Sequence, residues 1–150
     1  MHKLDDKDFK LLGELAKDSS KSIPKVSKEL GIDASVAYSR VKRLIRLGYI
    51  KGYTIKVNED LLGWKILAWV GVNAESKKRD NVYTALLSIP EVSSAAEVTG
   101  RYDFIIMVKA QNIDNLHQTI TNKVGVVEGV TYTETFISLR SSTKSFELLK

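Results

Sequence analysis

The sequence lacks cysteine altogether and contains only two prolines and two histidines among its 150 residues. The absence of cysteine excludes disulfide frameworks, cysteine zinc sites and cysteine nucleophiles. His2 and His117 have no neighbour at metal-ligand spacing, so no metal site is predicted. The longest apolar runs, residues 66–72 and 104–108, are far shorter than the roughly 18 residues that a membrane span needs. Residues 1–6 turn acidic at once and contain no signal-peptide core, so we expect a cytoplasmic protein with no membrane partner.

The charge of the chain is unevenly distributed. Hydrophobic residues make up 43% of the sequence, which is enough for a packed core, and the net charge is +5. Residues 1–60 contain 13 Lys and Arg against 9 Asp and Glu, whereas residues 61–150 contain 10 against 9. The segment from Ala34 to Val57 has no acidic residue and six cations, which are Arg40, Lys42, Arg43, Arg46, Lys51 and Lys56. This charge pattern alone has two explanations, a solvated helix face or a phosphate-facing surface, and the sequence pattern must distinguish them.

The first third of the chain has the pattern of a helix-turn-helix. Leucines at helical spacing, with Asp5 as N-cap and Asp8 three residues further on, predict a helix over residues 5–18. A second short helix stops at Gly31, and a third follows over residues 34–47. Two short helices joined by a tight turn that contains glycine are typical of the helix-turn-helix motif. Residues 49–57 are rich in strand-forming side chains and are predicted to pair as a wing.

The third predicted helix has one apolar side and one polar side. Ala37, Val41, Leu44 and Gly48 form the stripe that is expected to pack inward. Hydroxyls, a phenol and cations occupy the other side, at Ser35, Tyr38, Ser39, Lys42 and Arg46. Such side chains contact base edges and phosphates in a major groove. We expect base contacts near the helix N-terminus, from Ser35, Tyr38 and Ser39, and mainly phosphate contacts from Arg40, Lys42, Arg43 and Arg46. A three-helix domain that docks protein is the alternative, but a merely solvated face usually mixes signs of charge.

The remaining ninety residues have a different pattern. Strands and helices are predicted in the order β-α-β-β-α-β, at residues 66–72, 79–89, 92–99, 102–110, 114–124 and 130–139. This is the order of the ferredoxin-like split βαβ fold. The predicted fold class is therefore α+β, with a winged helix-turn-helix domain in residues 1–60 and a ferredoxin-like domain in residues 61–150.

The second predicted domain shows no catalytic constellation. Its titratable candidates are Glu97, Asp103, His117 and Glu134, and their spacing provides no nucleophile, base and orienting group in recognisable order. A glycine-rich phosphate loop is also missing, because Gly100 stands alone in its turn. An enzyme is not expected.

Taken together, the two halves resemble the Lrp/AsnC, or feast/famine, family of regulators and its archaeal members in particular. The resemblance covers nearly the whole chain and rests on residues 4–8, 30–33, 40–44, 48–53, 99–103, 129–130, Thr133 and Thr135. It implies an N-terminal domain that binds double-stranded DNA. It also implies a C-terminal RAM (regulation of amino-acid metabolism) domain, which pairs its sheets into homodimers that assemble into tetramers or octamers. In that family, free amino acids bind between subunits and change assembly or DNA affinity.

The resemblance also implies an effector site. Its residues would be the turn Gly100, Arg101, Tyr102 and Asp103, together with Thr131, Thr133 and Thr135 on the last strand. Asp103 could bind an α-amino group, while Arg101 or the Gly100 N–H could bind an α-carboxylate. The threonine hydroxyls would suit a polar ligand such as glutamine. In the alternative interpretation, Gly100 only permits a positive φ and the threonines only favour a strand.

The sequence therefore predicts a sequence-specific DNA-binding transcriptional regulator that responds to a free amino acid and needs no other cofactor. One alternative is a ligand-sensing module that docks a protein partner rather than DNA. Another is a ferredoxin-like enzyme with Asp103 as its base, which the absence of acidic catalytic pairs disfavours.

Overall fold

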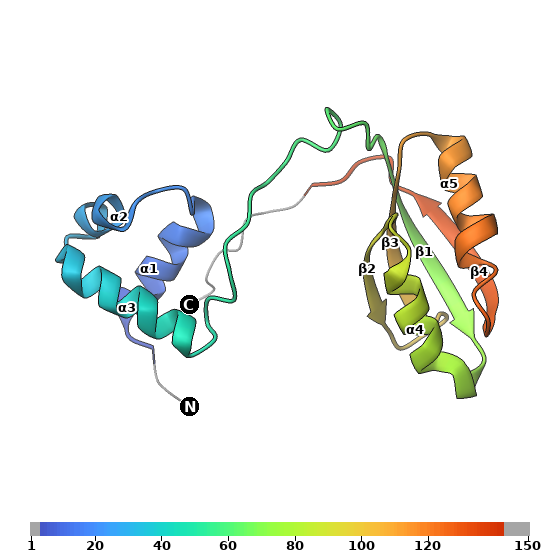
Figure 1. The fold of residues 1–150 in the computed structure, drawn as a ribbon, viewed down its shortest axis with the longest axis horizontal. Helices are drawn as coiled ribbons and strands as arrows, with labels where there is room; N and C mark the ends of the chain where they lie inside the picture. Colours follow the sequence, from blue (N-terminus) through green and yellow to red (C-terminus); the bar gives the residue numbers. More distant parts are fainter. Residues whose placement is uncertain (1–3, 143–150) are drawn as a thin grey trace. The chain divides into compact units, whose positions relative to one another are not determined.

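The computed structural model describes residues 4–142 and contains two compact units (Figure 1). The described residues up to Lys56 form the first unit, and Val57–Ser141 form the second. The first unit contains three helices, which are α1 (Asp6–Lys17), α2 (Ile23–Leu30) and α3 (Ala34–Arg46). The predicted helix-turn-helix is thus formed by α2 and α3.

Short-range hydrogen bonds fix where these helices begin and end. At the start of α1, the Asp8 N–H donates to the Asp5 carboxylate at 2.9 Å, and the Asp5 N–H donates to the Asp8 carboxylate at 3.1 Å. This reciprocal capping box satisfies two amide donors that the helix itself leaves unpaired. Gly31, with a φ of +64°, ends α2 in the left-handed conformation, and Asp33 caps α3.

One apolar stripe from each helix forms the core of the first unit. The buried residues are Leu11 and Leu15 of α1, Val26 of α2, and Ala37, Val41 and Leu44 of α3. The predicted inward stripe of the third helix is therefore confirmed for Ala37, Val41 and Leu44, whereas Gly48 lies beyond the end of α3 and is exposed. Burial of the stripe turns the opposite side of α3 toward solvent.

The strand expected over residues 49–57 does not form. A strand needs a neighbour to accept its N–H groups and donate to its carbonyls. The other elements of the first unit are helices, so the described residues of this unit offer no partner strand. Tyr53, Ile55 and Val57 remain exposed as a result.

The second unit contains a four-stranded antiparallel sheet in the order β2-β3-β1-β4. Its elements are β1 (Ile66–Ala74), a 3₁₀ turn (Ser76–Lys78), α4 (Arg79–Ser88), β2 (Val92–Glu97), β3 (Phe104–Ala110), α5 (Ile113–Thr119) with a π-helical continuation (Ile120–Val124), and β4 (Val130–Ile137). The predicted β-α-β-β-α-β order is confirmed.

The two faces of this sheet differ in what covers them. Val70 of β1 and Ile106 of β3 point toward the helices and pack with Leu86 of α4, so that all three are completely buried. Figure 1 shows α4 and α5 on this same face. On the other face, Trp69 and its cross-strand partner Phe136 are 43% and 47% exposed. The second unit therefore has one packed face and one open aromatic face.

Candidate DNA-binding and effector-binding surfaces

The outward side of α3 is the candidate DNA-binding surface. Tyr38 is 51% exposed, and Ser39, Lys42 and Arg46 are exposed along the same side of the helix. Among the described residues, no ion pair involves Lys42 or Arg46. These two charges are consequently available to an external anion.

Ser35 has a second, local role at the start of α3. Its N–H and its hydroxyl both donate to the Asp33 carboxylate, at 2.8 and 2.7 Å. These bonds cap the helix and hold the pKa of Asp33 below its usual range. The Ser35 hydroxyl oxygen keeps its lone pairs free, because the bond to Asp33 uses only the hydroxyl proton.

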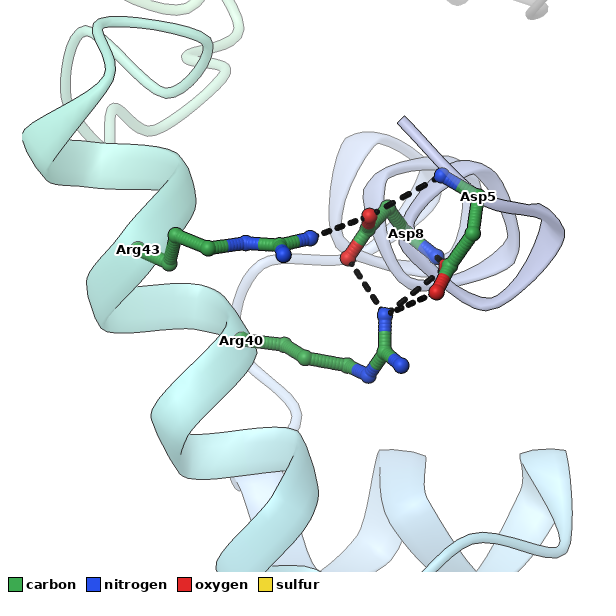
Figure 2. Close-up of polar contacts among 4 residues, drawn as sticks. All are labelled: Asp5, Asp8, Arg40 and Arg43. Carbon is green, nitrogen blue, oxygen red and sulfur yellow. Dashed lines mark hydrogen bonds and ion pairs between the residues drawn. The ribbon is translucent and has the colours of Figure 1, made fainter. Parts of the chain in front are cut away.

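Arg40 and Arg43 do not share the outward side of α3 with Lys42 and Arg46. Figure 2 shows both guanidinium groups directed at the start of α1. Arg40 Nη1 lies 2.7 Å from Asp5 Oδ2 and 2.9 Å from Asp8 Oδ1, and Arg43 Nη2 binds Asp8 Oδ2.

These ion pairs change the electrostatics of α3. The hydrogen bond from Arg40 is the main reason that the pKa of Asp5 falls from 3.8 to about 2, and the Asp8 N–H adds to this shift. The same hydrogen bond raises the pKa of Arg40. Sequence reasoning assigned Asp5 and Asp8 only to helix capping. The signal that it missed is an acidic pair spaced three residues apart, facing two arginines with the same spacing.

In the second unit, the turn between β2 and β3 carries four of the predicted effector residues. Gly100 has a φ of +123°, a conformation that side chains other than glycine rarely adopt. Asp103 accepts a hydrogen bond from the Ala74 N–H at 2.9 Å and also binds Arg79 at the start of α4. The Ala74 bond is the main cause that lowers the pKa of Asp103. The Asp103 carboxylate is therefore already bound within the chain.

Tyr102 lies on the open face of the sheet. Its ring covers Gly71 so closely that a Cβ at position 71 would lie 2.6 Å from ring atoms. The Tyr102 hydroxyl donates to Glu134 of β4, and the exposed Arg101 lies 3.5 Å from the same carboxylate. Glu134 and Gly71 are thus part of this surface, although sequence reasoning considered Glu134 only as a catalytic candidate and did not single out Gly71. The signal for Glu134 in the sequence is the alternation of β4. Because Glu134 lies between Thr133 and Thr135, its side chain belongs to the face opposite theirs, which is the open face.

The predicted threonine row belongs to the other face of the sheet. Thr133 and Thr135 are paired with Val72 and Val70, whose side chains point toward the helices. Thr131 lies at a register shift and has no partner in the ladder. Within one chain, the threonines and Tyr102 do not converge on a common site.

Other kinds of site are not found among residues 4–142. No cluster of three or more His, Cys, Asp or Glu side chains that could hold a metal occurs there. No helix in these residues is both long enough and apolar enough to cross a membrane. A groove of about 1220 Å³ lies in the first unit, lined in part by Phe9, Leu12 and Tyr53, and it contains none of the predicted effector residues.

The chain is similar to known regulators along both units. Residues 67–148 match the Lrp/AsnC ligand binding domain family, and residues 4–51 match the winged helix-turn-helix DNA-binding family. The HTH-type transcriptional regulator FL11 of the archaeon Pyrococcus furiosus is 34% identical over 145 residues, which cover 97% of this chain and 95% of the relative.

Solved structures agree with this likeness. Escherichia coli AsnC is 26% identical, with a TM-score of 0.90 over 97% of this chain and 99% of its own. A feast or famine regulatory protein from Mycobacterium tuberculosis, complexed with L-methionine, is 26% identical with a TM-score of 0.87 over 95% and 96% of the two chains.

These matches confirm the predicted resemblance, including the likeness to archaeal members, and the order of the two domains. The relatives are transcriptional regulators rather than enzymes, in agreement with the lack of a catalytic constellation. The chain belongs to the Lrp/AsnC family of transcriptional regulators, with a helix-turn-helix unit followed by a ligand-binding domain.

Proposed function

We propose that this protein is a homo-oligomeric regulator that binds specific double-stranded DNA sequences and changes its assembly or DNA affinity when a free amino acid binds. The observation that carries the proposal is the outward side of α3, where Tyr38, Ser39, Lys42 and Arg46 are exposed on the second helix of a helix-turn-helix. A helix in this position of the motif enters the major groove.

The side chains of α3 divide by chemistry into two groups. Ser35, Tyr38 and Ser39 lie in its N-terminal half and carry groups that hydrogen-bond to base edges. Lys42 and Arg46 lie farther along the helix and carry charges that bind phosphates. We assign base reading to the first group and phosphate binding to the second.

A gel-retardation series tests this assignment. The DNA would be a duplex that the wild-type protein selects from a randomised pool, with a scrambled duplex of equal length as control. Lys42→Ala should weaken binding to both duplexes and reduce the slope of log affinity against log salt by about one. Tyr38→Ala should instead change which sequences are preferred. Equal effects of both substitutions on both duplexes would contradict the division, and no retardation at moderate salt would favour a protein-docking module.

The open face of the sheet supports self-association. Trp69, Phe136 and Tyr132 expose aromatic surface there, and aromatic side chains are enriched in protein interfaces. We infer that two copies pair through this face, and that such dimers assemble further into tetramers or octamers. A dimer would present two copies of α3 to half-sites about one helical turn, or a multiple of it, apart.

A free amino acid is the proposed effector. The match to a ligand-binding domain supports it, as does the L-methionine complex of the mycobacterial relative. Of the predicted effector residues, Arg101 is exposed and only distantly paired with Glu134, at 3.5 Å, so its guanidinium can turn to an α-carboxylate, whereas the Asp103 carboxylate is held by Ala74 and Arg79. Because Thr133 and Thr135 lie on the other face, the predicted site requires groups from more than one copy.

A thermal-shift panel of the twenty amino acids tests the effector proposal. Glutamine is our specific hypothesis, because a row of hydroxyls suits a polar side chain. A ligand at 100 times its dissociation constant should stabilise the bound state by about 2.7 kcal/mol. A shift with another amino acid would correct the ligand, and no shift in melting or assembly would remove the effector role while leaving DNA binding intact.

A further inference from the structure

Four charged side chains connect the first turn of α1 to the middle of α3 (Figure 2). Arg40 Nη1 donates to both oxygens of Asp5, at 2.8 and 2.7 Å, and to Asp8 Oδ1 at 2.9 Å. Arg43 binds the other oxygen of Asp8, which also accepts the Asp5 N–H. We call Asp5, Asp8, Arg40 and Arg43 the α1–α3 ion-pair network.

Burial makes this network a geometric constraint rather than a surface feature. The Asp8 side chain is completely buried, and the Arg40 side chain is only 20% exposed. A buried carboxylate is stable only when charged or polar groups surround it in good geometry. Because Asp8 also belongs to the capping box of α1, the network joins the helix end directly to α3.

The network also divides the cations of α3 into two classes. The charges of Arg40 and Arg43 are compensated by Asp5 and Asp8, whereas no ion pair among the described residues involves Lys42 or Arg46. A phosphate ligand needs a charge that is free to leave its protein partners. Arg40 and Arg43 would leave a buried carboxylate behind, which is costly.

We propose that Arg40 and Arg43 are positioning residues, which hold α3 at the angle required for reading base edges, and that they are not phosphate ligands. The proposal rests on the DNA-binding function inferred above. Direct readout depends on side chains that reach particular base edges, so a small rotation of α3 reduces discrimination between sequences. It has much less effect on nonspecific binding, which depends on the number of phosphate contacts.

Asp8→Asn is the most discriminating test, because a positioning role predicts weaker binding to a preferred DNA sequence and a phosphate-binding role predicts tighter binding. The probes are a duplex selected by the wild-type protein from a randomised pool and a scrambled duplex of the same length. We expect Asp8→Asn to weaken binding to the selected duplex by at least about tenfold, with little change in binding to the scrambled duplex or in the salt slope. Asp6→Asn is the matched control, because it removes the same charge from an exposed position in the same helical turn.

Other results with Asp8→Asn would overturn the proposal. If Arg40 and Arg43 were phosphate ligands restrained by Asp8, the substitution would tighten binding to both duplexes and increase the salt slope. If the network were only structural, the melting temperature would fall while the affinity of the folded protein for both duplexes stayed unchanged. Circular dichroism at the binding temperature provides the folded fraction for this comparison.

Substitutions at Arg40 keep the proposal testable if Asp8→Asn does not fold. Arg40→Gln should reduce discrimination between the duplexes at an unchanged salt slope, and Arg40→Lys should restore part of it. Lys42→Gln is the positive control for a phosphate ligand, with a slope reduced by about one. The same reduction with Arg40→Gln would contradict a positioning role.

Failure of the proposed function is distinguishable from failure of this inference. A wild-type protein that enriches no duplex from the randomised pool and retards no DNA would contradict DNA binding itself. Discrimination by the wild-type protein that survives both Asp8→Asn and Arg40→Gln would overturn only the positioning role.

Discussion

The two units of this chain differ in the interactions that support their proposed functional surfaces. The first unit has a small core of six buried apolar residues and adds an ionic network that fixes α3. The second has thirteen buried apolar residues between a sheet and its helices, and the opposite face of the sheet stays uncovered. An ionic network thus connects α1 to the helix proposed to bind DNA, whereas apolar packing supports the face proposed for assembly.

This difference has practical consequences for experiments. Substitutions in the sheet core should lower the free energy of unfolding. Substitutions in the α1–α3 ion-pair network should also change how that free energy depends on pH and salt. The two responses can be followed separately, because Trp64 and Trp69, the two tryptophans of the chain, both lie in the second unit. Tryptophan fluorescence therefore reports on the second unit, while far-UV circular dichroism also detects the helices of the first.

The largest effect is expected at Leu86, in the core of the second unit. Leu86 is completely buried, so Leu86→Ala should reduce the free energy of unfolding by about 2–5 kcal/mol. Urea denaturation followed by tryptophan fluorescence measures this loss. Leu87→Ala is the matched control, since its side chain is 44% exposed and the effect should stay within about 0.5 kcal/mol. Similar losses at both positions would contradict the packing described for α4.

The open face provides the second prediction, which concerns assembly. If two copies pair through this face, Trp69→Ala should weaken the dimer by about 2 kcal/mol, or roughly 30-fold in dissociation constant. Sedimentation across a concentration series measures this change. Ile113→Ala removes a comparably exposed apolar side chain from α5 and should leave the dimer intact. An unchanged dimer in the Trp69 variant would exclude this face as the interface.

Much of this architecture could be predicted from local patterns in the sequence. The order of strands and helices, the Asp5 N-cap and the buried stripe of α3 depend on residues within a turn or two of each other. The ion pairs of Arg40 with Asp5 and Asp8 could not be predicted in this way, because these residues are 35 and 32 positions away in the sequence. They meet Arg40 only because α1 packs against α3. Lys42 and Arg40 therefore look equivalent in the sequence, although the structure places them differently.

The effector residues were predicted incompletely for the same reason, since their arrangement depends on contacts between distant parts of the chain. Alternation correctly grouped Thr133 with Thr135, but it could not show that their face is the one turned toward the helices. The contact of Asp103 with Arg79 connects a turn to a helix that precedes it by more than twenty residues. The strand predicted over residues 49–57 failed because strand formation depends on a partner as well as on propensity.

A third prediction concerns the contact between Tyr102 and Gly71. Gly71→Ala would place a Cβ 2.6 Å from the Tyr102 ring, so the ring must move and its hydrogen bond to Glu134 is lost. We expect a destabilisation of about 1–3 kcal/mol in urea denaturation. Gly52→Ala is the control, because a Cβ there meets no atom within 4 Å.

A double substitution shows whether the ring is the cause. Adding Tyr102→Ala removes the clash, so Gly71→Ala should then cost much less than it does in the wild-type background. Equal costs in the two backgrounds would mean that the glycine is needed for some other reason.

The smallest expected effect is the pH dependence that Asp5 contributes to the first unit. Arg40 and the Asp8 N–H lower the pKa of Asp5 from 3.8 to about 2 in the folded protein. Because the folded pKa is lower than the unfolded one, this stabilisation is present above about pH 4 and is lost as the pH falls toward 2. The effect should be modest, since the Asp5 side chain is half exposed and solvent screens the pair.

Comparison of the wild-type protein with Arg40→Gln isolates this contribution from that of the other acids. Urea midpoints measured by far-UV circular dichroism should fall less steeply between about pH 4 and pH 2 in the variant, because its Asp5 pKa lies closer to the unfolded value. Asp103 of the second unit also has a lowered pKa, but its cause is the Ala74 N–H rather than Arg40. Tryptophan fluorescence should therefore show the same acid response in both proteins. A variant that changed the acid response of both units equally would contradict the assignment of this pH dependence to the Asp5–Arg40 pair of the first unit.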